Sequence, residues 1–400
     1  MEHGLAQFFS SGILSSFRKG IRIKHPFSKR SMKLPQSLNF QDDAILKKYR
    51  LMELYSGIGG MRYAIEAAGI PFEIVAAFDI NPFVNKIYCH NFGFHHLSRN
   101  ILSLTAAEVE CLKVDIITLS PPCQPFTRVG LKRDIEDERT NSFLHVLNVI
   151  SELQKKPLYL ILENVQGFEN SQTRKKLIET LKKSGYRYQE FLLSPKDFGI
   201  PNSRLRYYII AKQQQLPFSF DCVQQVLFKM PKEAYSWTAV CEKCCQQQYS
   251  ASIPRCSVGH FLEEKPEEYF SSFLISDDAL LKHWTVFDMV NKSGTNSCCF
   301  TKAYRHYAQG TGSVLFSVED SEVSDILSRV TSTNVSEDKL ALLKKLQLRY
   351  FTPKEIANIM CFPKQFDFPE DVTIRQRYKA LGNSLNVFVA ACVIQLLFET

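Results

Sequence analysis

The stretch "YRLMELYSGIGGMRYAIEAAG" (residues 49–69) decides the fold. Its first eight residues predict a short strand, the glycines predict a tight turn, and "MRYAIEAAG" predicts a helix that stops at Gly69. The alternation continues, with strands predicted at 73–79, 113–120 and 158–164 and helices at 82–92, 142–155 and 173–185. Such alternation predicts an α/β fold around a mostly parallel sheet, in which ligands gather at the carboxyl ends of the strands.

The regular pattern covers residues 48–213. Its last two strands, 186–193 and 204–212, are joined by a short connection, which predicts an antiparallel hairpin at one edge of the sheet. Residues 214–345 lack the alternation and are predicted to be an inserted second domain. Residues 346–400 return to the main domain, with a helix at 351–362 and a long apolar helix at 381–398.

The composition is that of an ordinary globular chain, with 400 residues, 45% of them hydrophobic and 22% charged. No apolar run is long enough to cross a bilayer, so we expect no membrane partner. A net charge of +8 permits a nucleic-acid partner without proving one. The twelve cysteines are too sparse for a disulfide scaffold, which indicates a reducing compartment with free thiols.

Residues 1–47 form a basic N-terminal extension that we exclude from the fold. No acidic residue occurs between Glu2 and Asp42, whereas Lys and Arg recur at Arg18, Lys19, Arg22, Lys24, Lys29, Arg30 and Lys33. This composition suits an organelle transit segment, a disordered arm that touches RNA phosphates, or a tail without a role. We expect a protein of the cytoplasm and the nucleus, or of an organelle if the segment is a transit peptide.

The glycine-rich turn and the next strand end point to a nucleotide-like ligand. Gly57, Gly59 and Gly60 allow close backbone approach, but their spacing matches neither a dinucleotide fingerprint nor a phosphate-binding loop. Asp79 ends the second strand, where an acid commonly accepts hydrogen bonds from ribose hydroxyls, although it could instead cap the helix that follows. Together they predict a cofactor that carries a nucleoside.

The stretch "ITLSPPCQPFTRVG" (117–130) places Cys123 just after a buried strand. Pro121, Pro122 and Pro125 stiffen the chain on both sides of this cysteine. One interpretation is a rigid turn with a packed thiol. The other is a nucleophile held in position, since a thiolate is a strong nucleophile near neutral pH.

Three more polar residues lie at predicted strand ends. Glu163 leaves a buried strand, where its pKa should be raised and suit a proton donor, unless it only caps the next turn. Arg204 and Arg206 have strand spacing and would share one face. They suit a phosphate or a polarised carbonyl, or they form a solvated basic face.

These blocks, in this order, resemble the cytosine-5 methyltransferases that use S-adenosylmethionine. The blocks are the glycine turn at 57–60, Pro121-Pro122-Cys123-Gln124, Glu163-Asn164-Val165, Arg204-x-Arg206 and Gly382-Asn383-Ser384. "NSCCFTKAYRHYAQGTGSVL" (296–315), with Cys299-Phe300-Thr301, is similar to the hallmark of the branch of aspartate-tRNA methyltransferases once named as a second DNA methyltransferase. The resemblance covers nearly everything after the N-terminal extension.

The resemblance implies a Rossmann-like class I methyltransferase sheet, with residues 48–213 as the catalytic and cofactor-binding domain and 214–345 as a target-recognition domain. It implies methyl transfer to C5 of cytosine 38 in the anticodon loop of tRNA(Asp). The alternatives are a DNA cytosine-5 methyltransferase and a catalytically silent nucleic-acid-binding relative. We expect a monomer.

The resemblance also assigns roles. Cys123 would add to C6 of the cytosine, Glu163 would bind its N3 edge, and Arg204 and Arg206 would bind its carbonyl or the nearby backbone. The residues implied to line the cofactor pocket are Ile58, Gly59, Gly60, Asp79, Ile101, Leu102, Ser120 and Ser384. Cys299 and Thr301 would border the substrate.

The sequence departs from the family pattern at two places and contains one weak metal-binding pattern. Asn100 stands where many relatives have an acid that binds adenine, and the N-terminal extension is unusual for the branch. Cys241, Cys244, Cys245 and Cys256, followed by His260, could suggest a metal site. A structural zinc site usually needs a second well-spaced pair, so we expect no metal.

Overall fold

The computed structural model describes residues 48–93, 97–122, 134, 137–231 and 255–398. Residues 47–400 belong to one compact unit. The N-terminal extension (1–47), Cys123 and the cysteines at 241, 244 and 245 lie outside the described residues. The predictions made for them therefore stay predictions.

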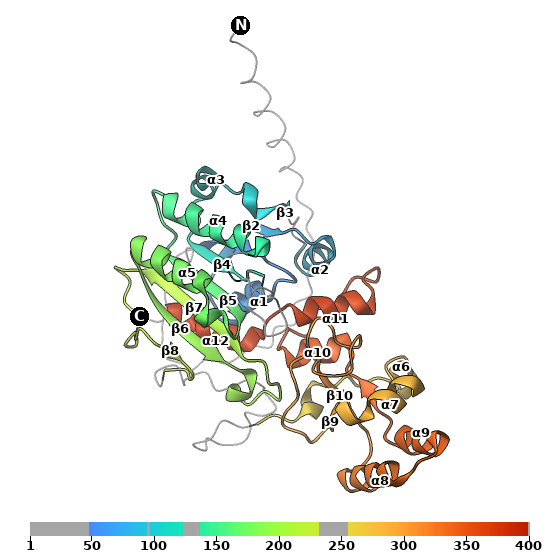
Figure 1. Ribbon diagram of the computed structural model, residues 1–400. Coiled ribbons are helices and arrows are strands. Elements are labelled where there is room, and N and C mark those ends of the chain that lie inside the picture. The colour runs from blue at the N-terminus through green and yellow to red at the C-terminus, as the bar shows by residue number, and fades with distance from the viewer. Residues whose placement is uncertain (1–47, 94–96, 123–133, 135–136, 232–254, 399–400) are drawn as a thin grey trace, which may run out of the picture. The chain divides into compact units, whose positions relative to one another are not determined.

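Eight strands form one sheet in the described part of the chain (Figure 1). In spatial order they are β3 (Leu97–Ser98), β2 (Phe72–Asp79), β1 (Tyr49–Leu54), β4 (Ile116–Leu119), β5 (Tyr159–Val165), β7 (Arg206–Gln213), β6 (Tyr186–Leu193) and β8 (Val226–Leu227). Strands β1 to β5 pair in parallel, whereas β7 is antiparallel to both β5 and β6. The predicted parallel sheet and hairpin are confirmed, but β8 pairs with β6 and takes the outer edge.

Helices cover both faces of this sheet (Figure 1). One face carries α1 (Gly60–Ala67), α2 (Pro82–Phe92) and α12 (Val387–Phe398), and the other carries α3 (Ala106–Cys111), α4 (Glu138–Glu152) and α5 (Gln172–Lys183). Short 3-10 turns lie at η1 (Ile101–Ser103), η4 (Phe168–Asn170), η5 (Pro195–Phe198), η7 (Val258–Phe261) and η8 (Trp284–Val286). The two hydrophobic clusters, one on each face, are the core that fixes the strand ends in place.

The predicted continuous helix at 381–398 is wrong, because the chain breaks inside it. Helix α11 (Ile374–Gly382) ends, and α12 begins at Val387. Asn386 accepts a hydrogen bond from Val389 N (3.0 Å), which caps the new helix, and donates to Ile359 O (3.2 Å). By length and composition Ile374–Phe398 could cross a membrane, but 72% of its apolar window is buried inside the protein, as in a core helix.

A second, three-stranded sheet lies in the later part of the described chain. It contains β9 (Asp288–Val290), β10 (Ser313–Leu315) and β11 (Arg349–Tyr350), with helices α6 (Glu267–Ser271), α7 (Asp277–His283), α8 (Asp320–Ser332) and α9 (Ser336–Lys345). It has its own hydrophobic cluster. The predicted boundaries at 213/214 and 345/346 stay predictions, while β8 pairs within the large sheet and β11 within the small one.

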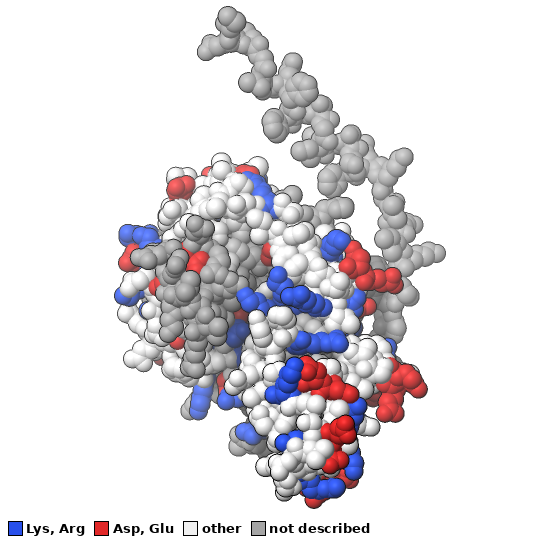
Figure 2. Space-filling view, turned by 45° about the vertical axis from the view of Figure 1, so that its right-hand side comes forward, with Lys and Arg blue, Asp and Glu red and all other residues white. Residues whose placement is uncertain are grey.

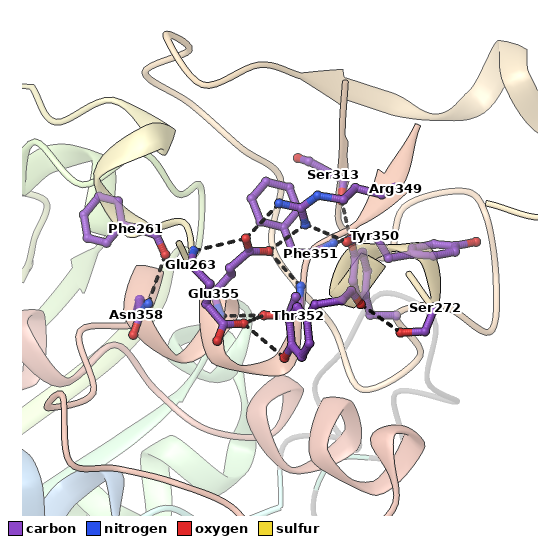
Figure 3. A network of polar contacts seen from close by, with 12 residues as sticks. Phe261, Glu263, Ser272, Ser313, Arg349, Tyr350, Phe351, Thr352, Glu355 and Asn358 are labelled. Carbon is purple, nitrogen blue, oxygen red and sulfur yellow. Dashed lines mark hydrogen bonds and ion pairs between the residues drawn. The ribbon is translucent and has the colours of Figure 1, made fainter. Parts of the chain in front are cut away.

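A buried ion pair joins the small sheet to the chain that returns to the main core. Arg349 of β11 forms two 2.8 Å contacts with Glu355 of α10 (Pro353–Ile359), and α10 packs in the same cluster as α1 and α12. Figure 3 shows Thr352 and Glu263 beside this pair. Both charges are paired and buried, so separating the two segments would leave an uncompensated buried charge.

Candidate active site

The strand register brings the predicted site residues to one edge of the sheet. Four apolar residues lie side by side across the parallel strands and pack in one cluster, namely Leu54, Phe78, Leu119 and Leu162. The next residues of β2, β4 and β5 are Asp79, Ser120 and Glu163. Since side chains alternate along strands, these three lie at the carboxyl edge and point away from that cluster.

A cavity of about 480 Å³ opens at this edge. The predicted site residues that line its wall are Ile58, Gly60, Asp79, Ile101, Leu102, Ser120, Glu163, Arg204, Arg206 and Ser384. Gly59, Cys299 and Thr301 lie outside the wall. The volume is within the range that small-molecule sites commonly have.

The glycine turn is bound directly to Asp79. The Gly57 N–H donates to one carboxylate oxygen (3.0 Å) and the Asn81 N–H to the other (2.9 Å). Burial raises the pKa of Asp79, and these N–H groups partly offset the effect. Gly59 has a φ of 83°, and a Cβ there would lie 2.3 Å from the Phe92 ring, so only glycine lets α2 pack against the turn.

The neighbouring wall is built by Asn100 and the 3-10 turn after it. The Asn100 side chain accepts a hydrogen bond from Leu102 N (3.0 Å) and thereby caps η1. Ile101 is buried, whereas Leu102 is 49% exposed. The Asn100 amide therefore has a local structural role, and its predicted contact with an adenine stays a prediction.

Glu163 and Arg206 form the charged centre of the cavity. Their Oε1 and Nε atoms are 3.3 Å apart. Burial raises the pKa of Glu163 above its usual range, although Arg206 and then Arg204 oppose the shift. A carboxyl of this kind retains its proton to a higher pH and suits donation to a base nitrogen.

Arg204 has a different environment from Arg206. Strand β7 begins at Arg206, so the prediction that both arginines lie on one strand is wrong. The Arg204 side chain is buried and donates to the carbonyl oxygens of Phe300 (3.0 Å), Gly382 (3.0 Å) and Ser384. It therefore ties the hallmark segment to the chain between α11 and α12, and its predicted contact with a base carbonyl stays untested.

Cys299 lies beside both arginines. Its Sγ is 3.3 Å from Nη1 of Arg204 and 4.0 Å from Nη2 of Arg206. Burial alone would raise the pKa of the Cys299 thiol, but the two guanidiniums outweigh it and the net shift is downward. Thr301 is two residues further, where its N–H donates to Thr311 O (2.8 Å) and its Oγ1 accepts from Ala303 N (3.3 Å).

The stem of the Cys123 loop is held by the next strand, although Cys123 itself lies outside the described residues. Ser120 N donates to Leu54 O (3.3 Å), and the Asn164 side chain donates to Pro121 O (3.4 Å). Asn164 thus connects the Glu163 strand to the proline stem. The nucleophilic role of Cys123 stays a prediction.

Several residues of the wall were not predicted as site residues, namely Tyr55, Val84, Arg99, Asn164, Asn383 and Leu385. Asn164 and Asn383 lie inside the sequence blocks of the family resemblance, and Leu385 directly follows one. Their proximity in sequence to predicted site residues was the signal that could have identified them. In the described residues no group of three or more His, Cys, Asp or Glu could hold a metal. The expectation of no metal stays a prediction.

Known proteins resemble this chain along most of its length. A family model described as C-5 cytosine-specific DNA methylase matches residues 49–399. A tRNA (cytosine(38)-C(5))-methyltransferase from Bos taurus is 42% identical, covering 88% of this chain and 100% of the relative. One from Schizosaccharomyces pombe is 38% identical, covering 88% and 98%.

Solved structures agree with the sequence match. The crystal structure of a DNMT2 mutant from Spodoptera frugiperda has a TM-score of 0.76 at 41% identity, covering 88% of this chain and 100% of that one. The structure of the S. pombe Dnmt2 methyltransferase has a TM-score of 0.73 at 35% identity, covering 88% and 99%. The sheet is therefore the class I methyltransferase fold, and the chain belongs to the C-5 cytosine methyltransferase family, in the same branch as these relatives.

Proposed function

We propose that this enzyme transfers a methyl group from S-adenosylmethionine to C5 of cytosine 38 in the anticodon loop of tRNA(Asp). The observation that carries the chemistry is that Glu163 and Arg206 line the same cavity as Asp79 and the glycine turn. One pocket therefore offers a polar corner for a base and a nucleotide-type wall for a cofactor. The relatives' names support cytosine 38 of a tRNA as the target.

The wall fits S-adenosylmethionine by the chemistry of its groups. Asp79 offers carboxylate oxygens to ribose hydroxyls, and Ile101 and Leu102 offer apolar surface to an adenine ring. Glycines of the turn let a ligand approach the backbone closely. When bound there, the cofactor supplies an electrophilic methyl group.

The chain's own residues would prepare the cytosine to accept that methyl group. C5 of cytosine is a weak nucleophile until the Cys123 thiolate forms a bond to C6, which makes the ring an enamine. Glu163 donates a hydrogen bond at N3 and stabilises the electron density that moves there. After C5 is methylated, a base such as a water molecule takes the C5 proton, the C–H electrons form the C5=C6 double bond, and the C6–S bond breaks to release the Cys123 thiolate and restore the aromatic ring.

An anticodon loop suits this pocket, because the target base must leave its stack to reach it. A base in a loop is already unpaired, so less energy is needed to extrude it than in a duplex. One relative at 33% identity, from Dictyostelium discoideum, is named a DNA (cytosine-5)-methyltransferase, which keeps DNA as the second candidate substrate.

A methyl-transfer assay tests the proposal. The full chain is incubated with labelled S-adenosylmethionine and tRNA(Asp), a tRNA(Asp) with cytosine 38 replaced, other tRNAs, or duplex DNA. We expect label only in unaltered tRNA(Asp); label in DNA alone would refute the RNA substrate. Cys123→Ala should abolish transfer, whereas the control Cys111→Ala, at an exposed position on α3, should not.

Compartment, oligomeric state and the role of residues 1–47 are proposed separately. We expect a monomer in the cytoplasm and the nucleus. The N-terminal sequence of the protein isolated from cells tests the transit alternative, because a transit peptide would be removed before about residue 45.

A further inference from the structure

A turn inside the hallmark segment (296–315) carries an exposed aromatic ring. Tyr307 is 63% exposed, whereas Phe300 and Tyr304 of the same segment are buried. The His306 ring lies 4.5 Å from the Tyr307 ring, between centroids. A large exposed ring with a ring neighbour offers a flat face that the protein core does not use.

The backbone beneath this ring is anchored on both sides. Tyr307 N donates to Ala303 O (3.2 Å), and Thr311 Oγ1 donates to Tyr307 O (2.7 Å). The base of the turn is closed by Thr301 N to Thr311 O (2.8 Å). The ring is therefore presented from a preorganised backbone, which lowers the entropy cost of binding.

The same turn touches the wall of the active site. A Cβ on Gly382, which lines the cavity, would lie 2.1 Å from Lys302 N, so the two backbones are in direct contact. Tyr307 is five residues beyond Lys302, in a turn closed by hydrogen bonds from Tyr304 N to Thr301 O (3.1 Å) and from His306 N to Ala303 O (2.9 Å). Its backbone therefore belongs to the same short turn that contacts the cavity wall.

Basic side chains occur in this turn and on the helix that ends at Gly382. Exposed basic side chains occur at Lys302 and Arg305 in the turn and at Arg375 and Lys379 on α11, which leads to Gly382. Figure 2 shows Lys and Arg gathered across the middle of the drawn face, with Asp and Glu lower and to the right. Cations beside an exposed ring favour a nucleic acid, because they attract phosphates while the ring stacks on a base.

We propose that Tyr307, supported by His306, stacks on an unpaired base next to the target cytosine in the RNA loop. This inference rests on the proposed function, since extrusion of the target leaves its neighbours without a stacking partner. Tyr307 is then a substrate-positioning residue, which acts outside the cofactor pocket and before the chemical step.

Binding measurements with the full chain test the stacking. Fluorescence anisotropy with an anticodon stem-loop RNA is compared for the wild type, Tyr307→Ala, Tyr307→Phe and the control Phe228→Ala, whose side chain is 66% exposed. Loss of one stacked base should weaken binding by roughly 5- to 100-fold in Tyr307→Ala. Tyr307→Phe and Phe228→Ala should stay within about twofold of the wild type.

Abasic RNAs identify the partner base. Removing one loop base beside the target should weaken wild-type binding, and the same removal should have no further effect on Tyr307→Ala. Two results would overturn the stacking alone, provided that the wild type methylates the RNA. In the first, Tyr307→Ala binds the RNA as tightly as the wild type does. In the second, every abasic RNA weakens the binding of Tyr307→Ala as much as it weakens the binding of the wild type. A wild type that neither binds nor methylates the RNA would overturn the proposed function and this inference together.

Discussion

Oε1 of Glu163 lies 3.3 Å from Nε of Arg206, and both side chains are only about a tenth exposed, at 10% and 13%. Burial drives the Glu163 carboxyl toward its neutral form, whereas the positive charge of Arg206 favours the charged form of that carboxyl. This opposition sets the protonation of the group that would face the base.

Glu163→Gln keeps an amide donor but removes the carboxyl. We expect the single-turnover methylation rate to fall by roughly 10²- to 10³-fold, because the amide responds less to charge that develops on the ring. The affinity for S-adenosylmethionine, measured by calorimetry, should change little. The control Glu152→Gln on α4 should leave the rate unchanged, and a Glu163→Gln enzyme at full rate would contradict the assigned role.

Arg206→Gln should move the pH profile of the reaction. Removing the guanidinium removes an influence that lowers the pKa of Glu163, so that pKa rises further. If the protonated carboxyl is the active form, the rate falls as pH rises through its pKa, and this falling limb should shift to higher pH in Arg206→Gln. Single-turnover rates across the pH range check this, and an unmoved limb means that Glu163 does not control it.

Arg204→Lys tests a structural role beside the catalytic one. A lysine cannot reproduce the planar contacts with Phe300, Gly382 and Ser384, so buried carbonyls lose their donors. We expect the free energy of unfolding to fall by roughly 2–4 kcal/mol. The control Arg187→Lys, at an exposed position on β6, should unfold like the wild type in urea.

Gly382→Ala should disrupt the contact between α11 and the hallmark turn. The new Cβ would meet the Lys302 backbone at 2.1 Å, and a backbone cannot rotate away as a side chain can. We expect a loss of about 1–3 kcal/mol in unfolding free energy and a large loss of methylation. Gly310→Ala has no atom within 4 Å of its new Cβ and bears only the cost of its positive φ, so it should retain most activity. Equal activity in the two variants would exclude the clash as the cause.

We expect the free energy of unfolding to depend on pH through Glu53, which is fully buried on β1. Burial raises the pKa of Glu53 to about 7, although a hydrogen bond from the Tyr88 hydroxyl opposes the shift. The folded state therefore favours the proton, so the stability that this group contributes is complete below about pH 4.5 and is lost as pH rises to about 7.

Glu53→Gln should remove this dependence. Relative to the wild type, its free energy of unfolding should rise between pH 4.5 and 7, by roughly 3 kcal/mol in total, and stay level above that range. Urea unfolding at several pH values measures the difference, with the exposed Glu152→Gln as the control. A constant difference across pH would show that Glu53 has no raised pKa.

The sequence by itself determined six strands of the large sheet (β1, β2, β4, β5, β6 and β7) and the helices α1, α2, α4 and α5. It also determined the positions of Asp79, Ser120 and Glu163 at strand ends. These follow from local periodicity and from the rule that parallel strands share one carboxyl edge, so one chain read alone carries the signal. The ordered blocks led to the family for the same reason, because each is a short continuous stretch.

Only the tertiary structure decided which distant groups meet. Arg204 reaches Phe300 and Gly382 across 96 and 178 residues, and Arg206 reaches Cys299 across 93. The break before Val387 likewise depends on packing, since Asn386 is held by Ile359 O of another helix. Such contacts form when separate elements pack together, and periodicity along one segment contains no information about its partner.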